Sequence, residues 1–259
     1  MRLMNDMQVE VIVAPDLPTL VEWAAKLVCE SLSGPVRRAI CLTGGSTPKP
    51  IYQRLAREPY RSELRWDRVH WFWGDDRFVP QDDERSNAAM ARSAFLDCLP
   101  IPPSCIHAIP TNTVDHHEAA RRYEDTLRGF YGSDRFDPGR PLFDLVLLGL
   151  GSDGHTASLF PGDPALQETN RWAVGIDQAG LAPFVPRVTL TFPALASTRQ
   201  MVFLVSGKDK RDMVKHILSG VDLPAARART SAPVLWMLDR AAAPDSYPLT
   251  SEPVYQRKT

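Results

Sequence analysis

A histidine in a glycine-rich segment is the strongest candidate for chemistry in this chain of 259 residues. His155 lies in residues 149–161, GLGSDGHTASLFP, at the end of an apolar, strand-like run. An imidazole titrates near neutral pH and can accept a proton from water, and Asp153 could orient the ring. A histidine that only caps or packs is the ordinary alternative. The Asp-Gly-His context makes His155 a candidate general base.

The same segment matches the dinucleotide-binding pattern GxGxxG through Gly149, Gly151 and Gly154. That fingerprint requires a long helix after the glycines, whereas Pro161 would stop a helix after little more than one turn. We therefore do not expect a nicotinamide site. Ser158 lies on that expected short helix and outside a GxSxG elbow, so a serine acyl-enzyme is not expected either.

A segment rich in glycine and hydroxyl groups, residues 42–48 (LTGGSTP), is a candidate anion site. Gly44, Gly45, Ser46 and Thr47 separate a buried strand from a helix that should begin at Pro48. Glycines let backbone N–H groups approach an anion, and the start of a helix favours negative charge. A tight turn with a capping hydroxyl is the alternative. The nucleoside-triphosphate pattern GxxxxGK[ST] is absent.

Charged residues end an aromatic strand in residues 71–80, WFWGDDRFVP. Arg77 could grip a phosphate or offset a developing oxyanion, and Asp75 could bind sugar hydroxyls or hold Arg77 in place. Arg187 and Lys210, which adjoin later strand-like runs, could complete a phosphate site. Surface salt bridges and solvated charges are the commoner explanation for each of these residues taken singly.

The elements that must position these residues alternate between strands and helices, which predicts a mostly parallel sheet covered by helices in one domain, residues 1–259. A first helix should follow a cap at Asp16 or Thr19, and another should run from a cap at Asp115 to about Phe130. Its two first-turn histidines, 116 and 117, are interpreted as solvated. Strands are expected at 9–13, 39–42, 69–73, 145–150, 172–176, 188–191, 201–205 and 234–238.

Composition narrows the classes of function. The formal net charge of −1 removes the bulk attraction on which nucleic-acid and membrane-surface binders rely, while a small anionic ligand remains compatible. We find no signal peptide and no apolar run long enough for a membrane span. The four cysteines form neither a CxxC pair nor a zinc motif, so we expect a cytoplasmic protein without a metal site.

Taken together, the motifs resemble the 6-phosphogluconolactonase family, within the wider group that includes glucosamine-6-phosphate deaminases. GGSTP, WGDDRFVP followed by Ser86 and Asn87, LGLGSDGHTASLFP, PRVTLTFPAL and SGKDK occur in the family order between about residues 40 and 210. The resemblance implies a three-layer α/β sandwich with a doubly wound, mostly parallel sheet. It also implies cofactor-free hydrolysis of 6-phospho-D-glucono-1,5-lactone to 6-phosphogluconate, the second step of the oxidative pentose phosphate pathway.

The resemblance also implies roles for single residues. His155 would be the general base and Asp153 its neighbour, while Asp75 matches the catalytic carboxylate of the deaminases. Asp76 stands where the family commonly has Glu. The substrate and phosphate contacts would come from Gly44, Gly45, Ser46, Thr47, Arg77, Arg187 and Lys210.

Two other functions stay open. A glucosamine-6-phosphate deaminase would share the phosphate loop and the His turn, but deaminases resemble DEY and FNEP where this chain has Asp76-Arg77 and residues 158–161, SLFP. A non-catalytic sugar-phosphate sensor would keep the loop and could lose the base. The partner we expect is a small phosphorylated sugar lactone, with neither nucleic acid nor membrane, bound by a monomer.

Overall fold

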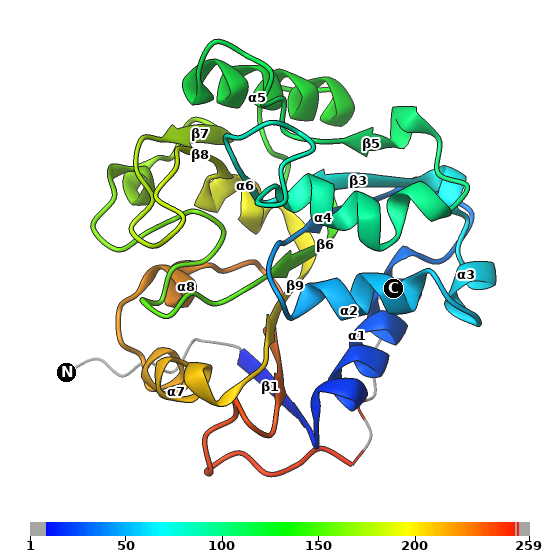
Figure 1. Ribbon diagram of the computed structural model, residues 1–259, viewed down its shortest axis with the longest axis vertical. Helices are drawn as coiled ribbons and strands as arrows, with labels where there is room; N and C mark the ends of the chain where they lie inside the picture. The colour runs from blue at the N-terminus through cyan, green and yellow to red at the C-terminus, as the bar shows by residue number, and fades with distance from the viewer. Residues whose placement is uncertain (1–8, 252, 254–259) are drawn as a thin grey trace.

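A seven-stranded sheet forms the centre of the computed structural model, which describes residues 9–251 and 253 (Figure 1). Every neighbouring pair of its strands is parallel, which confirms the predicted sheet type. The strands are mostly buried, as expected for a parallel sheet covered on both faces. In spatial order they are β1 (Val9–Ala14), β10 (Val234–Asp239), β9 (Thr198–Val205), β6 (Phe143–Leu148), β2 (Arg38–Leu42), β3 (Val69–Trp73) and β5 (Ile106–His107).

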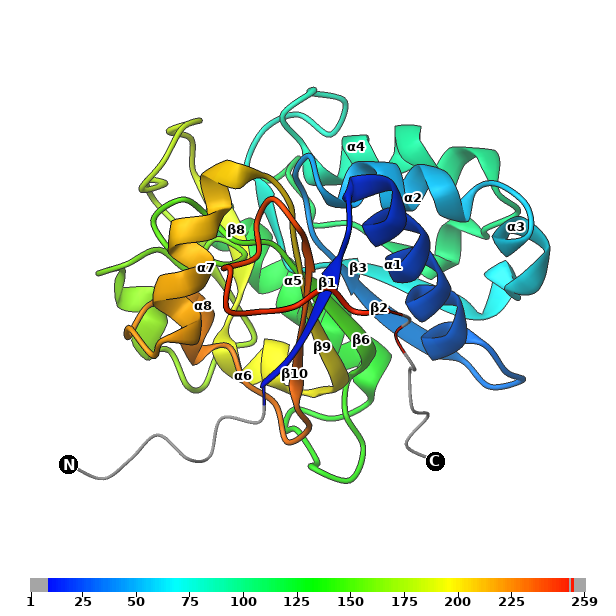
Figure 2. The same cartoon turned by 90° about the horizontal axis from the view of Figure 1, so that it is seen from below.

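Helices cover the two faces of this sheet. Figure 2 shows α1, α2 and α4 on one side of it and α7 and α8 on the other. The three-layer, doubly wound architecture implied by the resemblance is therefore confirmed. The helices are α1 (Leu17–Leu32), α2 (Pro48–Leu55), α3 (Tyr60–Glu63), α4 (Asn87–Ala94), α5 (His116–Tyr131), α6 (Phe192–Ala196), α7 (Arg211–Leu218) and α8 (Pro224–Arg227).

The helix starts follow the predicted signals. Asp16 caps α1 by accepting a hydrogen bond from the backbone N–H of Thr19 at 2.8 Å, so Asp16 rather than Thr19 is the cap. Asp115 caps α5 in the same way through the N–H of Glu118, at 2.7 Å. Proline opens α2, where a missing N–H costs no intrahelical bond.

A second, antiparallel sheet was not predicted. It consists of β4 (Asp75–Arg77), β8 (Arg187–Leu190) and β7 (Ala173–Ile176). The runs at 172–176 and 188–191 therefore do form strands, but not in the parallel sheet. Gly74 joins the two sheets, because its N–H donates to Leu42 O at 2.9 Å and its carbonyl accepts from Leu190 N at 2.7 Å. Strand β4 thus continues directly from β3 and leaves the central sheet.

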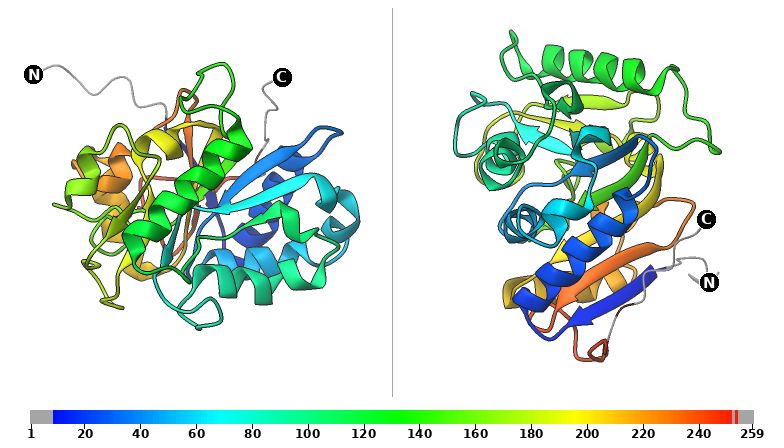
Figure 3. Two further views of the ribbon diagram at one scale, coloured as in Figure 1. Left: turned by 90° about the horizontal axis from the view of Figure 1, so that it is seen from above. Right: turned by 90° about the vertical axis from the view of Figure 1, so that its right-hand side faces the viewer.

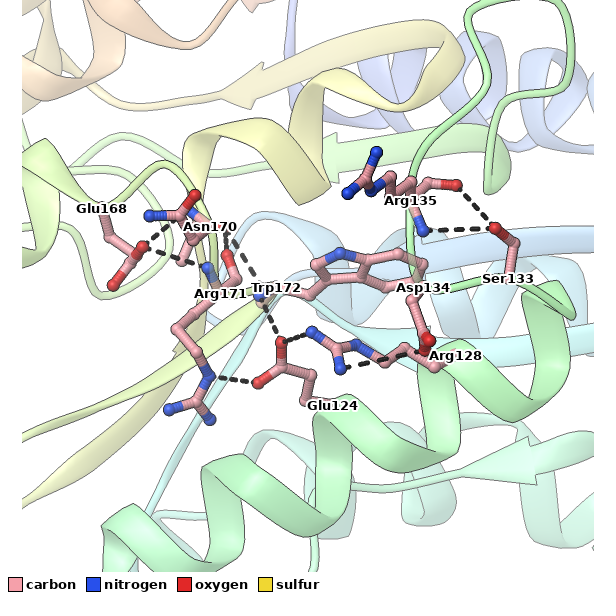
Figure 4. Close-up of polar contacts among 10 residues, drawn as sticks. Glu124, Arg128, Ser133, Asp134, Arg135, Glu168, Asn170, Arg171 and Trp172 are labelled. Carbon is pink, nitrogen blue, oxygen red and sulfur yellow. Dashed lines mark hydrogen bonds and ion pairs between the residues drawn. The ribbon is translucent and has the colours of Figure 1, made fainter.

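Helix α5 covers the small sheet and is fixed to it by a buried carboxylate (Figures 3 and 4). Glu124 is 3% exposed. Its Oε1 accepts from Arg128 Nη2 at 2.8 Å and from the backbone N–H of Trp172 at 3.1 Å, and its Oε2 accepts from Arg171 Nε. A buried carboxylate needs such partners to offset its lost hydration. Glu124 therefore anchors α5 to the chain that enters β7.

None of the helices among residues 9–251 and 253 is long and apolar enough to cross a membrane. The four cysteines are free, with Cys98 exposed and Cys29, Cys41 and Cys105 buried.

Candidate active site

A polar pocket opens where β2, β6 and β9 end at their carboxyl edges, next to β4 and β8. Parallel α/β sheets bind ligands at this edge. Of the predicted site residues, those that line the pocket are Gly44, Gly45, Asp75, Arg77, His155, Arg187 and Lys210. Asp153, Ser46 and Thr47 do not line it. Residues from five separate segments of the chain therefore meet in one pocket.

His155 is held by Asp153 and keeps one ring nitrogen free. Its Nδ1 lies 2.6 Å from Asp153 Oδ1, and its backbone N–H donates to the same oxygen at 3.1 Å. Burial raises the pKa of the Asp153 carboxyl, but the hydrogen bond and charge of His155 outweigh burial, so the pKa is lowered. An ionised carboxylate beside Nδ1 favours the tautomer with the proton on Nδ1. Nε2, without a partner in residues 9–251 and 253, is then available to accept a proton.

The turn around His155 is not the short helix that the sequence analysis expected. Thr156 and Leu159 form an isolated antiparallel bridge, and Ala157 has φ of 49°, in the left-handed region that a helix cannot use. A Cβ at Gly151 would lie 2.0 Å from His155 Nδ1, so only glycine lets the imidazole lie against this backbone. Strain and close approach together fix the position of the ring.

Two arginines face each other across the small sheet. Arg77 of β4 pairs with Arg187 of β8 in the antiparallel register. Arg77 Nη1 donates to Arg85 O at 2.6 Å and to Asn87 Oδ1 at 2.9 Å, and Arg187 Nη2 donates to Pro183 O at 3.1 Å. The Nε atoms of both arginines are buried without a partner in the described part of the chain. Like charges directly opposite are unfavourable unless an anion joins them.

Burial also acts on Arg187 itself. The residue is 5% exposed, and desolvation lowers its pKa, with Arg77 acting in the same direction and the carboxylate of Asp75 opposing it. A buried, incompletely paired guanidinium is costly. The pocket is therefore suited to a ligand with negative charge.

The two adjacent carboxylates of β4 have different surroundings. Asp76 is 1% exposed and accepts hydrogen bonds from the backbone N–H groups of Arg77, Asn87 and Ala88 and from Ser86 Oγ. Burial raises its pKa to about 6. Asp76 thus holds the start of α4 and does not line the pocket. Its side chain, although shorter than the Glu common in the family, reaches all of these hydrogen-bond donors.

Asp75 lines the pocket and is 5% exposed. Its Oδ2 accepts from Ser158 Oγ at 2.6 Å, while Oδ1 has, among the described residues, only a long contact of 3.4 Å with Asn87 Nδ2. One carboxylate oxygen therefore stays available to a ligand hydroxyl.

The segment after β2 presents backbone donors. The N–H groups of residues 44–47 have no hydrogen-bond partner within the described residues, whereas the N–H of Thr43 donates to the hydroxyl of Tyr52. A Cβ at Gly44 would lie 1.8 Å from Asn87 Oδ1, so this glycine is required by close approach. Ser46 is exposed and lies outside the pocket lining.

Thr47 joins this segment to the end of β9. Its Oγ1 lies 2.8 Å from Ser206 Oγ, so it does not cap α2 as the alternative interpretation proposed. Ser206 precedes the short helical turn Lys208–Lys210, from which Lys210 reaches the pocket. The free N–H groups and the Lys210 ammonium are thereby brought to one end of the site.

Sequence reasoning missed some contributors. Asn87, Phe160 and Ser158 all contact predicted site residues: Asn87 binds Arg77, Phe160 packs 4.5 Å from the His155 ring, and Ser158 binds Asp75. All three lie inside the motifs that were singled out, and only tertiary structure reveals their partners. His116 was also misjudged, because its side chain is 13% exposed and hydrogen-bonds to Asp177.

Comparisons with known proteins place the chain within one group. The family model described as "Glucosamine-6-phosphate isomerases/6-phosphogluconolactonase" matches residues 17–236. A 6-phosphogluconolactonase of Nostoc sp. is 38% identical over 239 residues, which cover 89% of this chain and 95% of the relative. The structure of 6-phosphogluconolactonase from Trypanosoma cruzi is 31% identical with a TM-score of 0.80, covering 91% of this chain and 96% of that one.

The fold also extends to a second activity. A structure of a monomeric glucosamine-6-phosphate deaminase is 20% identical with a TM-score of 0.77, covering 90% of this chain and 98% of that one. At this identity the likeness shows a shared fold alone.

Proposed function

The chain belongs to the family of glucosamine-6-phosphate isomerases and 6-phosphogluconolactonases, and we propose that it hydrolyses 6-phospho-D-glucono-1,5-lactone with His155 as the general base. The reaction is that of a carboxylic ester hydrolase and is the second step of the oxidative pentose phosphate pathway. The observation that carries the proposal is the Asp153–His155 pair, whose free Nε2 belongs to a residue lining an arginine-bearing pocket.

In the proposed reaction, His155 Nε2 removes a proton from water as the water oxygen attacks C1 of the lactone. The carbonyl oxygen takes up the negative charge of the tetrahedral intermediate, and Arg77 supplies a cation for it. When the C1–O bond of the ring breaks, the imidazolium returns its proton to the departing ring oxygen. The open-chain carboxylic acid and a free hydroxyl result, and the acid loses its remaining proton to the solvent to give the carboxylate. No covalent enzyme intermediate is needed.

The phosphate is assigned to the other end of the pocket. The unpartnered N–H groups of Gly44 and Gly45 and the Lys210 ammonium provide donors and charge there. Holding the phosphate away from C1 converts its binding energy into correct placement of the lactone beside His155. Arg187, opposite Arg77, completes the positive lining, and Asp75 orients a sugar hydroxyl through its open oxygen.

Residue types separate this reaction from the deaminase reaction of the same family. Where the deaminases resemble DEY, this chain has Arg77 after Asp76. Where they resemble FNEP, it has Ser158, which donates a hydrogen bond to Asp75 Oδ2, and Phe160, which packs against the His155 ring. The chain has no additional acid in residues 156–161 that could serve isomerase chemistry. We propose the lactonase accordingly, as one domain that works as a monomer in the cytoplasm.

The reaction is tested by following proton release at neutral pH from freshly prepared lactone, against its spontaneous hydrolysis. We expect the protein to accelerate opening and to leave glucosamine 6-phosphate unchanged. Acceleration no greater than the blank, or turnover of glucosamine 6-phosphate, would contradict the assignment.

A substitution at Asp153 tests whether His155 acts as a general base or only contributes to substrate binding. Asp153→Asn removes the charge that selects the Nδ1-protonated tautomer, so we expect kcat to fall by about 10²-fold or more with little change in KM. An unchanged kcat would show that the water is activated elsewhere.

A further inference from the structure

Two histidines and an aspartate meet outside the pocket, where the start of α5 contacts the end of β7. His116 and His117 are the first residues of α5, and Asp177 directly follows β7. The Nε2 atoms of the two histidines lie 2.8 Å and 3.0 Å from the same oxygen, Asp177 Oδ1. All three potential ligand atoms lie within 4.8 Å of one another. Three ligand groups from two separate elements therefore converge on one point.

A glycine in β7 leaves room for the two imidazole rings. A Cβ at Gly175 of β7 would lie 2.7 Å from His116 Cδ2 and 2.7 Å from His117 Nδ1. Any side chain at Gly175 would displace both imidazoles, so glycine is required for the convergence. Phe78 packs against His116 from β4's side, with ring centroids 6.0 Å apart. Both imidazoles thus lie against the backbone of β7 at Gly175, and His116 also contacts the ring of Phe78.

We propose that His116, His117 and Asp177 bind a divalent transition-metal ion, with zinc as the best match. Zinc takes imidazole nitrogen and carboxylate oxygen at about 2.0–2.2 Å, in a tetrahedron whose ligand atoms are about 3.3 Å apart. The two nitrogen–oxygen separations of 2.8 Å and 3.0 Å need to open by a few tenths of an ångström, and the two histidine ligand atoms, which lie within 4.8 Å of each other, need to reach a similar separation. The Asp177 side chain is 81% exposed and that of His117 is 51% exposed, so water can supply the fourth ligand.

Such an ion would act on the segment next to the active site. Asp177 begins the connection 177–186 between β7 and β8, and Leu181 and Ala182 of this connection line the pocket. A metal bond between α5 and Asp177 would fix the first residue of that connection. The metal site would therefore stabilise the connection 177–186 without using the catalytic residues. Metal binding there does not depend on the proposed hydrolysis.

The test is calorimetric titration of zinc alone into tag-free protein that has been stripped with a chelator. We expect saturable binding of one equivalent. His117→Ala and Asp177→Asn each remove one ligand and should weaken the affinity by about 10-fold or more. His216→Ala, which removes an exposed histidine on α7, and His155→Ala, which removes the pocket histidine, should leave the affinity unchanged.

Folding is monitored in the same samples by circular dichroism with chelator present, because both substituted ligands are exposed and should leave the apo fold intact. Zinc should raise the melting temperature of the wild type more than that of Asp177→Asn. Absence of saturable binding, binding unaffected by both ligand substitutions, or binding lost in His155→Ala would each overturn the proposal.

Discussion

Two carboxylates in this molecule each hold basic side chains at close range: Glu124 beneath α5 and Asp153 beside the pocket. Both oxygens of Glu124 are occupied, by Arg128 and the Trp172 N–H on one and by Arg171 on the other (Figure 4). Asp153 uses Oδ1 alone to hold His155, and the two side chains are 27% and 20% exposed. Both oxygens of the Glu124 carboxylate are thus paired within the protein, whereas the Asp153–His155 pair leaves His155 Nε2 without a partner in the described residues.

The pairing of polar atoms therefore distinguishes a charged cluster that stabilises the fold from charged groups that are available to a ligand. Around Glu124, partners offset the cost of burying the charge, and the result is a fixed position for α5. Around the pocket, the buried Nε atoms of Arg77 and Arg187 and the more exposed N–H groups of residues 44–47 have no partner in the described residues. Beside Glu124 the Nε atom of Arg128 is also unpartnered, but both carboxylate oxygens are paired. Buried polar groups rarely stay unpaired without a reason. The unpaired donors of the pocket indicate where a ligand completes the structure.

The largest expected effect comes from removing the unused nitrogen. His155→Ala should lower kcat by about 10²–10⁴-fold, the usual contribution of a general base. Its free energy of unfolding should change by less than about 1 kcal/mol, because the ring makes few contacts that the fold requires. Proton release from the lactone measures the first quantity and urea unfolding the second.

His216→Ala is the matched control, since it removes an exposed histidine far along the chain, on α7. It should change neither quantity. If His155→Ala kept its activity and lost stability, the pocket would be a structural cluster like that of Glu124, and the comparison would fail.

Glu124 is expected to show the opposite pattern. Glu124→Ala leaves two arginines and the buried N–H of Trp172 without their acceptor, and should cost about 3 kcal/mol of unfolding free energy. Activity of the folded fraction at low temperature should stay within about twofold of the wild type. Unfolding in urea, with activity assayed below the transition, measures both.

Glu118→Ala gives the control on the same helix. Glu118 also pairs with two arginines, Arg121 and Arg122, but at the surface, where such pairs contribute about 0–1 kcal/mol. Equal losses in the two variants would mean that burial does not set the strength of the Glu124 cluster.

The sequence predicted more of the backbone than of the polar contacts. Apolar runs and helix caps located most strands and α1, α2 and α5, because periodicity and capping are local properties. The antiparallel sheet escaped prediction, because β4 is only three residues long and begins straight after Gly74, at the end of a predicted strand. A short helix before Pro161 was expected, but Ala157 at positive φ and the Thr156–Leu159 bridge make a turn.

The site shows the same limit. Motif spacing identified His155, Asp153 and Arg77, because residue type and position within a strand-to-helix connection carry that information. The burial of Glu124 agrees with its place on the buried stripe of α5, but Arg171 is 47 residues away and no local signal links the two. His116 was interpreted as solvated for the same reason, since its partner Asp177 lies 61 residues further on.

Lys210 should give a smaller effect that is confined to substrate binding. Lys210→Ala removes the cation assigned to the phosphate and should lower kcat/KM by about 10–100-fold, mainly through KM. Lys208→Ala removes an exposed lysine of the same turn and should have little effect. Steady-state kinetics of both variants compare them directly. A loss confined to kcat would instead assign Lys210 to the reacting end of the pocket.

The smallest expected effect concerns a third arrangement, in which two half-buried titratable groups are paired with each other and not with a charge. His70 Nδ1 and His107 Nε2 lie 2.9 Å apart, and Phe72 and Phe130 pack around the two rings. Burial, then His107 and Arg37, lower the pKa of His70 to about 4, and burial also lowers the pKa of His107. Below pH 6.5 the unfolded chain therefore binds more protons than the folded one at these positions, so stability falls as pH decreases from 6.5 to about 4.

His70→Phe keeps an aromatic ring and removes one of the two titrations, so its loss of unfolding free energy between pH 7 and pH 5 should be smaller than that of the wild type. Urea unfolding at both pH values measures this difference. The buffers should have equal ionic strength, so that the screening of surface ion pairs is the same at both pH values. Activity at pH 7 should be unchanged, because neither histidine lines the pocket. An identical pH dependence in the variant would show that carboxylates elsewhere govern acid stability, and that the half-buried His70–His107 pair matters less than the paired charges at Glu124.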